Sequence, residues 1–218
     1  MEGQTLILGV TGGAGAGKSR VLKYMEEMYG AYLILCDDVG AGLQRKGEAC
    51  YGPIADLFGP EYLLDDGELN RKKIAMAVFD DPGLLKKLTD IVHPAVRQRV
   101  KEEIEAHAGR KLIVIEAALL LDDHYDEICD EIWYIYAPEE VRRQRMKADR
   151  GYSDERIDEL FRTQRKEESF RALTDLTIDN SSDIIQNTCR QIDRALEERG
   201  FFPESGQGGV REDPACGI

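Results

Sequence analysis

The sequence is poor in the residues that build metal and disulfide sites, and it is short of positive charge. It has three histidines and five cysteines, and no two of the cysteines form a Cys-x-x-Cys pair. That pattern disfavours a zinc site or a disulfide framework and indicates reduced thiols, and hence a cytoplasmic protein. Lysine and arginine number 29 against 42 aspartates and glutamates, a formal net charge of −13. So acidic a chain lacks the basic footprint that nucleic-acid binding requires.

Long apolar runs are also missing. No stretch approaches the roughly 20 apolar residues that span a bilayer. The first residues show neither the basic nor the apolar segment of a signal peptide. We therefore expect a protein without a membrane anchor. With 218 residues, of which 42% are hydrophobic, the chain can bury the core of one α/β domain with insertions. The sequence leaves its oligomeric state open.

A glycine-rich segment near the start carries the clearest chemical signal. An apolar run at 5–10 stops at this segment, and a helical pattern follows at 19–29. The segment itself matches every fixed position of the pattern G-x-x-x-x-G-K-[ST], with the residues Gly12-Gly13-Ala14-Gly15-Ala16-Gly17-Lys18-Ser19. Glycines let such a loop turn its N–H groups toward phosphate oxygens, and the helix adds the positive end of its dipole. Lys18 is predicted to reach the outer phosphates of a nucleoside triphosphate, and Ser19 to bind Mg²⁺. The alternative is a glycine-rich turn with an incidental lysine. A dinucleotide loop would need a glycine at the position of Lys18.

Acidic side chains follow two other predicted strands. The apolar run 31–36 ends at Asp37 and Asp38, and the run 111–116 ends in Glu116. Because ligands of doubly wound sheets bind at the carboxyl ends of the strands, these acids are expected on the same rim as the loop. Glu116 is predicted to orient the Mg²⁺ shell, or else to be a solvated rim carboxylate. For Asp37 two interpretations stay open, the N-cap of the next helix and a base for an acceptor hydroxyl.

The remaining pattern predicts a P-loop NTPase fold, a three-layer α/β architecture with a five-stranded parallel sheet, a helical acceptor-binding insertion and a helical lid. Further strands are expected at 131–136 and 176–180, and His93-Pro94 is expected to open a helix. We predict a single domain over residues 1–202 and a disordered tail at 203–218. Within the domain, the predicted parts are a core (about 1–38, 93–146 and 173–202), the insertion (about 39–92) and the lid (about 147–172).

Lysines and arginines gather between residues 142 and 171 of this otherwise acidic chain. Most are expected to be solvated and paired with nearby acids, but a few are expected to stabilise charge on a transferring phosphoryl group. Gly151-Tyr152-Ser153 interrupts the helical pattern there. This predicts a hinged lid that excludes water, so that the phosphoryl group goes to the acceptor.

From about residue 5 to residue 197 the chain resembles the dephospho-coenzyme A kinase family. The resemblance rests on the loop segment 10–19 and on a set of shorter motifs along the chain: Cys36-Asp37, Val92-His93-Pro94, Leu119-Leu120, Arg145, Gln164, Asp175 and Ile178-Asp179-Asn180.

The resemblance implies that ATP phosphorylates the ribose 3′-hydroxyl of dephospho-coenzyme A, the last step of coenzyme A synthesis. It implies that Asp37 is the general base and that Arg145 is a lid arginine facing the phosphates. It places Asn180 near the adenine of ATP. His93 and Leu119, with the insertion 39–92, would help to bind the acceptor.

Several positions differ from the family pattern: Arg20, Leu35, Ala41, Ala118 and Phe170. A second lid arginine would be Arg150, one position from its expected place, which Asp149 occupies. Two other functions therefore stay open. One is a kinase of this fold acting on another small acceptor, a nucleoside monophosphate or a sugar. The other is an ATP-binding protein that transfers no phosphate.

Overall fold

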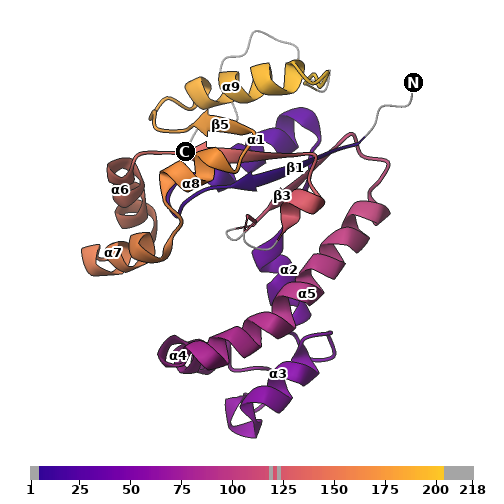
Figure 1. The fold of residues 1–218 in the computed structure, drawn as a ribbon, viewed down its shortest axis with the longest axis vertical. Helices are drawn as coiled ribbons and strands as arrows, with labels where there is room; N and C mark the ends of the chain where they lie inside the picture. Colours follow the sequence, from indigo (N-terminus) through magenta and orange to yellow (C-terminus); the bar gives the residue numbers. More distant parts are fainter. Residues whose placement is uncertain (1–4, 118–119, 122–123, 204–218) are drawn as a thin grey trace. The chain divides into compact units, whose positions relative to one another are not determined.

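The computed structural model describes residues 5–117, 120–121 and 124–203. Its contacts divide the chain into two compact units (Figure 1). The first unit comprises Met1–Leu33 and Ala108–Ile218, and the second comprises Ile34–His107. Residues 204–218 of the predicted tail lie outside the described part of the chain. The assignment of the insertion to acceptor binding and of 147–172 to a lid stays a prediction.

A five-stranded parallel sheet organises the fold, which confirms the predicted fold class. Its spatial order is β2-β3-β1-β4-β5, formed by β1 (Leu6–Thr11), β2 (Tyr32–Leu35), β3 (Leu112–Glu116), β4 (Glu131–Tyr136) and β5 (Leu176–Asp179). The first four residues of β3 are at most 1% exposed, as expected for an apolar strand covered on both faces. The parallel register pairs Val10 with Glu116, so this carboxylate lies next to the end of β1, where the glycine-rich loop begins.

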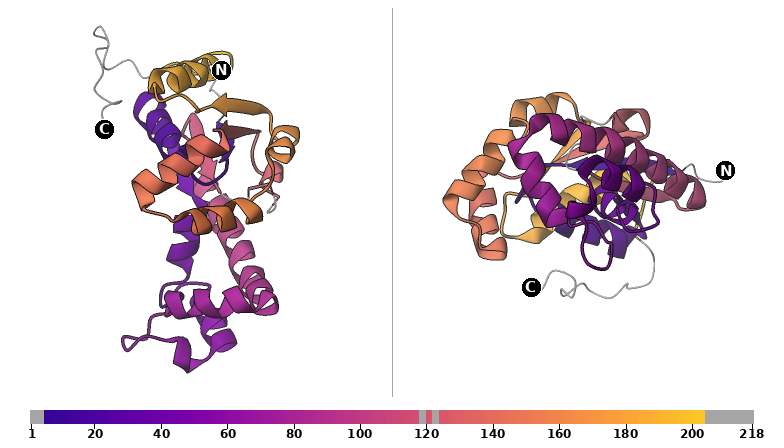
Figure 2. Two further views of the ribbon diagram at one scale, coloured as in Figure 1. Left: turned by 90° about the vertical axis from the view of Figure 1, so that its left-hand side faces the viewer. Right: turned by 90° about the horizontal axis from the view of Figure 1, so that it is seen from below.

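Six described helices belong to the first unit: α1 (Lys18–Tyr29), η2 (Tyr125–Glu127), α6 (Glu139–Arg150), α7 (Asp154–Thr163), α8 (Glu167–Ala172) and α9 (Ile185–Glu197). Helices α6 and α7 lie side by side (Figures 1 and 2). The break between them confirms the interruption predicted at Gly151, whose φ of 63° is left-handed. Hydrogen bonds connect α1 to α9: the hydroxyls of Tyr24 and Tyr29 on α1 both donate to Asp193 Oδ1 on α9, each at 2.7 Å.

The second unit is built around one long helix. Helix α5 (Pro82–Ala106) packs against α2 (Cys36–Leu43), α3 (Tyr51–Phe58) and α4 (Arg71–Asp80), and the short η1 (Pro60–Tyr62) follows α3. The approach of α2 is close, because a Cβ added at Gly40 would lie 3.4 Å from Val96 Cγ2.

The helix predicted to open at His93-Pro94 was placed wrongly, because α5 begins eleven residues earlier and contains Pro94 in its interior. Asp81 supplies a stronger start: its Oδ1 accepts from Gly83 N at 2.8 Å and from Leu84 N at 3.0 Å, and Pro82 occupies the first helical position. Packing against three other helices compensates for the hydrogen bond that Pro94 cannot donate.

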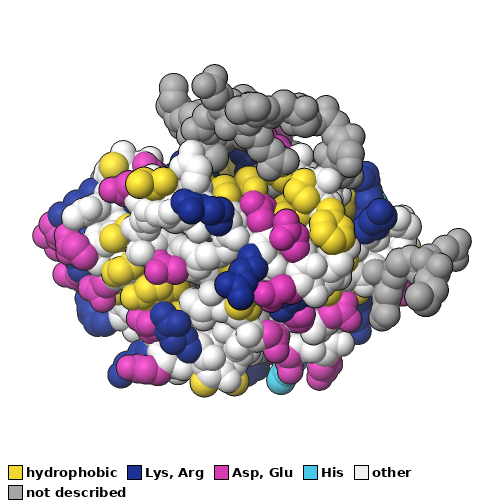
Figure 3. All heavy atoms as spheres, turned by 90° about the horizontal axis from the view of Figure 1, so that it is seen from above, with side chains coloured by type: hydrophobic (Ala, Val, Ile, Leu, Met, Phe, Trp, Pro, Cys, Tyr) yellow, Lys and Arg dark blue, Asp and Glu magenta, His cyan; other side chains and the backbone are white. Residues whose placement is uncertain are grey.

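Surface charge is mixed, as an acidic protein with many ion pairs would show. Basic and acidic side chains are interspersed over the face seen in Figure 3. Pairs within one helix turn, such as Arg194 Nε and Glu198 Oε1 at 3.1 Å, contribute to this pattern. Among the helices that the structure describes, none has the length and apolarity to cross a membrane.

Candidate active site

The glycine-rich loop joins β1 to α1, in the arrangement that the sequence predicted. Gly15 and Gly17 have φ values of 78° and 86°, a left-handed conformation that L side chains rarely adopt. Gly17 is the N-cap of α1, and a Cβ there would also collide with Asn180 Nδ2. Ser19 is exposed in the first turn of α1. The loop can therefore present backbone N–H groups and a helix N-terminus to an anion.

Lys18 is fixed from two sides. Its Nζ donates to Gly12 O at 2.8 Å and lies 3.4 Å from Glu116 Oε1. The side chains of Lys18 and Glu116 are only 16% and 15% exposed, so the ion pair is well shielded from water. This geometry brings together two residues that the sequence singled out separately, a phosphate-binding lysine and an acid at the end of a strand.

Asn180 forms a hydrogen bond with the backbone of the loop. Its side chain is buried, with 3% of its surface exposed. The amide Nδ2 donates to Ala16 O at 2.7 Å, and Oδ1 accepts from Thr188 Oγ1 at 2.9 Å. Both polar atoms of the amide are thus used to connect the loop with the residues after β5. Thr188 was missed by the sequence analysis, because a threonine inside an amphipathic helix carries no distinguishing signal.

Two arginines of α6 face the loop. Arg145 Nη1 is buried without a hydrogen-bond partner, and it lies 3.6 Å from the position that a Cβ on Gly17 would take. Arg142 Nη1 donates to Gln164 Oε1 at 3.0 Å, and the same oxygen accepts from Ala14 N at 3.2 Å. Arg150, in contrast, is exposed, and its guanidinium carbon lies 6.0 Å from the Tyr152 ring centroid.

Two of the predicted acceptor residues, Asp37 and His93, belong to the second unit. Asp37 and Asp38 are exposed in the first turn of α2, whose N-cap is Leu35 without a side-chain cap hydrogen bond. The N-cap interpretation of these acids is therefore wrong, and the role of Asp37 as a base stays a prediction. His93 lies in the middle of α5 and is half-buried. Leu119, like Ala118, lies outside the described residues.

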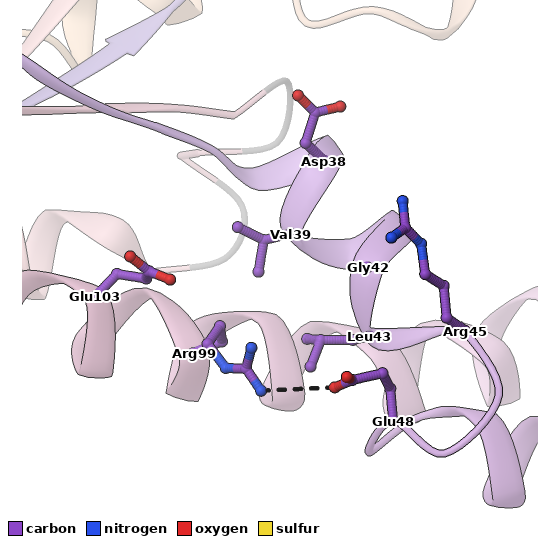
Figure 4. A pocket seen from close by; sticks show the side chains of 8 residues that line it. All are labelled: Asp38, Val39, Gly42, Leu43, Arg45, Glu48, Arg99 and Glu103. Atoms are coloured by element: carbon purple, nitrogen blue, oxygen red, sulfur yellow. Dashed lines mark ion pairs between the residues drawn. The ribbon is translucent and has the colours of Figure 1, made fainter.

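A hollow of about 280 Å³ opens between α2 and α5 within the second unit (Figure 4). It is lined by Asp38, Val39, Gly42, Leu43, Arg45, Glu48, Arg99 and Glu103. Arg99 Nη2 lies 3.8 Å from Glu48 Oε2. The hollow thus presents charged groups of both signs: Asp38 on α2, Arg45 and Glu48 after its end, and Arg99 and Glu103 on α5.

The family relationship follows from comparison of the sequence. The family described as Dephospho-CoA kinase matches residues 6–186, which include the loop, Asp37, Arg145 and Asn180. The chain belongs to the dephospho-CoA kinase family. This confirms the resemblance found from the motifs.

Curated members of the dephospho-CoA kinase family resemble the chain over most of its length. A Dephospho-CoA kinase of Carboxydothermus hydrogenoformans is 32% identical, covering 88% of this chain and 93% of the relative. One of Halalkalibacterium halodurans is 34% identical, covering 91% and 99%. In three dimensions the chain resembles the crystal structure of TT1252 from Thermus thermophilus, with a TM-score of 0.77, 29% identity and coverage of 89% and 98%.

The donor atoms of this family member suit a magnesium site that is completed by phosphate oxygens. Among the described residues, no group of three or more histidines, cysteines, aspartates and glutamates is placed to hold a metal ion. Mg²⁺ commonly takes one or two protein oxygens and completes its shell with water and phosphate oxygens. Ser19 Oγ and the Glu116 carboxylate are groups of this kind, so the residues fit the ion.

Proposed function

We propose that this chain transfers the γ-phosphoryl group of ATP to the ribose 3′-hydroxyl of dephospho-CoA, giving CoA and ADP, and that it does so in the cytoplasm. The observation that carries the proposal is the family match over residues 6–186, because that range includes the complete phosphate loop. The four described cysteines are free thiols, which supports a reducing compartment.

ATP would be bound by the loop residues Gly13, Ala14, Gly15, Ala16, Gly17, Lys18 and Ser19. Two features support this. Gly15 and Gly17 have the left-handed backbone that such a loop needs, and the buried Arg145 Nη1 lacks a partner. A buried guanidinium nitrogen without a hydrogen-bond partner is costly, and a bound polyphosphate would relieve that cost. Asn180, which fixes Ala16 O, would border the nucleotide on the β5 side.

Phosphoryl transfer needs positioning and neutralisation of charge more than covalent chemistry. Lys18 and Arg145 would stabilise charge on the equatorial oxygens of the transferring group. Asp37 would accept the proton of the 3′-hydroxyl as its oxygen bonds to phosphorus. Ser19 and Glu116 would hold Mg²⁺, which when bound neutralises charge on the ATP phosphates.

The acceptor would be bound by the second unit, with His93 among its contacts, and by Leu119 of the first unit. The hollow between α2 and α5 supports this assignment, because it exposes the cation Arg45, which would meet the pyrophosphate of dephospho-CoA. Small-molecule binding is also consistent with the acidic composition, and we propose no nucleic-acid or membrane partner.

The test is ADP formation from Mg-ATP with and without dephospho-CoA, with the product identified by mass. We expect ADP release that depends on the acceptor and a product one phosphate heavier. Nucleoside monophosphates and sugars offered at the same concentration should give no comparable turnover. ATP binding without turnover on dephospho-CoA would contradict the proposal.

A further inference from the structure

The basic side chains of helix α6 fall into two groups. Arg143 and Lys147 are paired: Lys147 Nζ lies 2.7 Å from Asp154 Oδ1, and Arg143 forms ion pairs with Glu139, Asp154 and Asp158. Arg142 and Arg145, three positions apart and therefore neighbours on one face of the helix, have no carboxylate at ion-pair distance among the residues that the structure describes. In this acidic chain, two guanidinium groups beside the phosphate loop thus form no ion pair, and the charges of Glu139 and Glu167 act on Arg142 only from beyond that distance.

Arg142 is partly withdrawn from solvent. Its guanidinium carbon lies 4.4 Å from the Phe161 ring centroid, and burial lowers the pKa of the guanidinium from its usual value. A shielded cation without a carboxylate partner is unfavourable, and an anion that reaches it gains a strong interaction. Such a group marks a site where negative charge is expected to bind.

The partner that Arg142 does have is neutral. Gln164, at the end of α7, places Oε1 between Arg142 Nη1 at 3.0 Å and Ala14 N at 3.2 Å. A carboxylate in this position would fix the guanidinium and also cancel its charge. A carboxamide fixes it and leaves the charge available, so Gln164 can aim Arg142 without competing strongly with a phosphate.

Gly13 makes the approach of Arg142 possible. A Cβ at this position would collide with Arg142 Nη1, and it would lie 2.9 Å from Gln164 Oε1. Arg142 Nη1 also reaches Ala14 O at 3.5 Å. The guanidinium therefore rests directly on the backbone of the phosphate loop.

We propose that Arg142 is a second arginine that binds the phosphates of ATP, beside Arg145, and that Gln164 is its positioning residue. The inference rests on the proposed assignment of the loop to ATP. Arg142 would thus take the role of second lid arginine that the family resemblance suggested for Arg150. Arg150 is exposed and has no contact with the loop among the interactions described.

The test is calorimetric titration of Arg142→Met with Mg-ATP and, separately, with inorganic triphosphate, which has no base or sugar. Loss of one charge-assisted hydrogen bond should weaken binding of both ligands by about 10- to 100-fold. The dependence of the dissociation constant on salt should also become shallower, since one cation fewer meets the phosphates. Arg162→Met is the matched control, because Arg162 is an exposed arginine on α7; its affinities should stay within about twofold of wild type.

Gln164 is tested through its coupling to Arg142. Gln164→Met should weaken ATP binding by a smaller factor, about 2- to 10-fold, and Arg142→Met/Gln164→Met should bind no more weakly than Arg142→Met alone. Gln164→Glu should weaken binding relative to wild type at pH 8 and approach wild type as the new carboxylate is protonated at lower pH. Additive losses in the double variant, or a pH-independent deficit for Gln164→Glu, would overturn the positioning role.

The outcomes separate this inference from the function on which it rests. If Arg142→Met binds inorganic triphosphate as tightly as wild type does, the inference is overturned, even if its binding of ATP is weaker. The arginine would then contact the adenosine part of ATP and not the phosphates. If Arg142→Met does not fold, Arg142→Lys replaces it: a loss of about 3- to 10-fold with the salt dependence retained supports the inference, and unchanged binding overturns it. A wild-type protein that binds neither ligand overturns the assignment of the loop itself.

Discussion

Replacing Asn180 with alanine tests whether the phosphate loop is held in shape by a residue 164 positions away in the sequence. The substitution removes two buried hydrogen bonds, to Ala16 O at 2.7 Å and from Thr188 Oγ1 at 2.9 Å. At about 0.5–1.5 kcal/mol net for each bond, the expected loss in the free energy of unfolding is about 1–3 kcal/mol. For a chain of this size, a loss of about 2 kcal/mol lowers Tm by roughly 4–8 °C.

The assay is urea unfolding of wild type and variant, with ATP affinity measured on the folded proteins. Asn187→Ala is the matched control, because Asn187 also hydrogen-bonds through its amide but is exposed on α9; we expect a change within about 0.5 kcal/mol. Thr188→Val should show part of the loss, and combining it with Asn180→Ala should be less than additive, since both changes remove the same bond.

Two results would refute the reasoning. If Asn180→Ala unfolds within about 0.5 kcal/mol of wild type, the two hydrogen bonds do not stabilise the fold. If stability falls while ATP affinity is unchanged, Asn180 supports the packing of β5 and α9 but does not shape the loop.

Three further outcomes are expected. Asp37→Asn should lower kcat with dephospho-CoA by about 10²- to 10⁴-fold and leave ATP affinity nearly unchanged; full turnover would rule out the base. Lys18→Met should weaken ATP binding and turnover together, because it removes the cation predicted to reach the outer phosphates; an unaffected variant would contradict the loop assignment. Burial raises the pKa of Glu131, but hydrogen bonds from Arg199 and Trp133 outweigh it and bring the pKa below its usual value of 4.5. The stabilisation from Glu131 is therefore present above pH 4.5 and lost as pH falls through the lower folded-state pKa, so Glu131→Gln should flatten the acid side of a stability–pH curve; an identical acid side would contradict this.

Helix starts illustrate where local patterns compete. Both Asp81-Pro82 and His93-Pro94 resemble the beginning of a helix, and the sequence analysis predicted a start only at the second. The structure continues one helix through Pro94, because α5 packs against three other helices along its length. Packing against other helices stabilises α5 through contacts that are distant in the sequence. The start of α5 could therefore not be predicted from the residues next to it.

The sequence by itself determined the phosphate loop, the parallel sheet and the family. The physical reason is that these depend on residues close together in the chain: the glycine spacing around Lys18 sets the loop backbone, and apolar runs ending in Glu116 or Asp37 mark the rim of a parallel sheet.

Only the tertiary structure decided that Arg142 and Gln164 also contact that loop. Gln164 reaches Ala14 across 150 positions. Arg142 and Arg143 look alike in sequence, yet Arg143 forms ion pairs with neighbouring acids and Arg142 forms none among the described residues. Whether a charge is paired depends on what the fold brings beside it, and this is a property of packing that spacing along the chain does not specify.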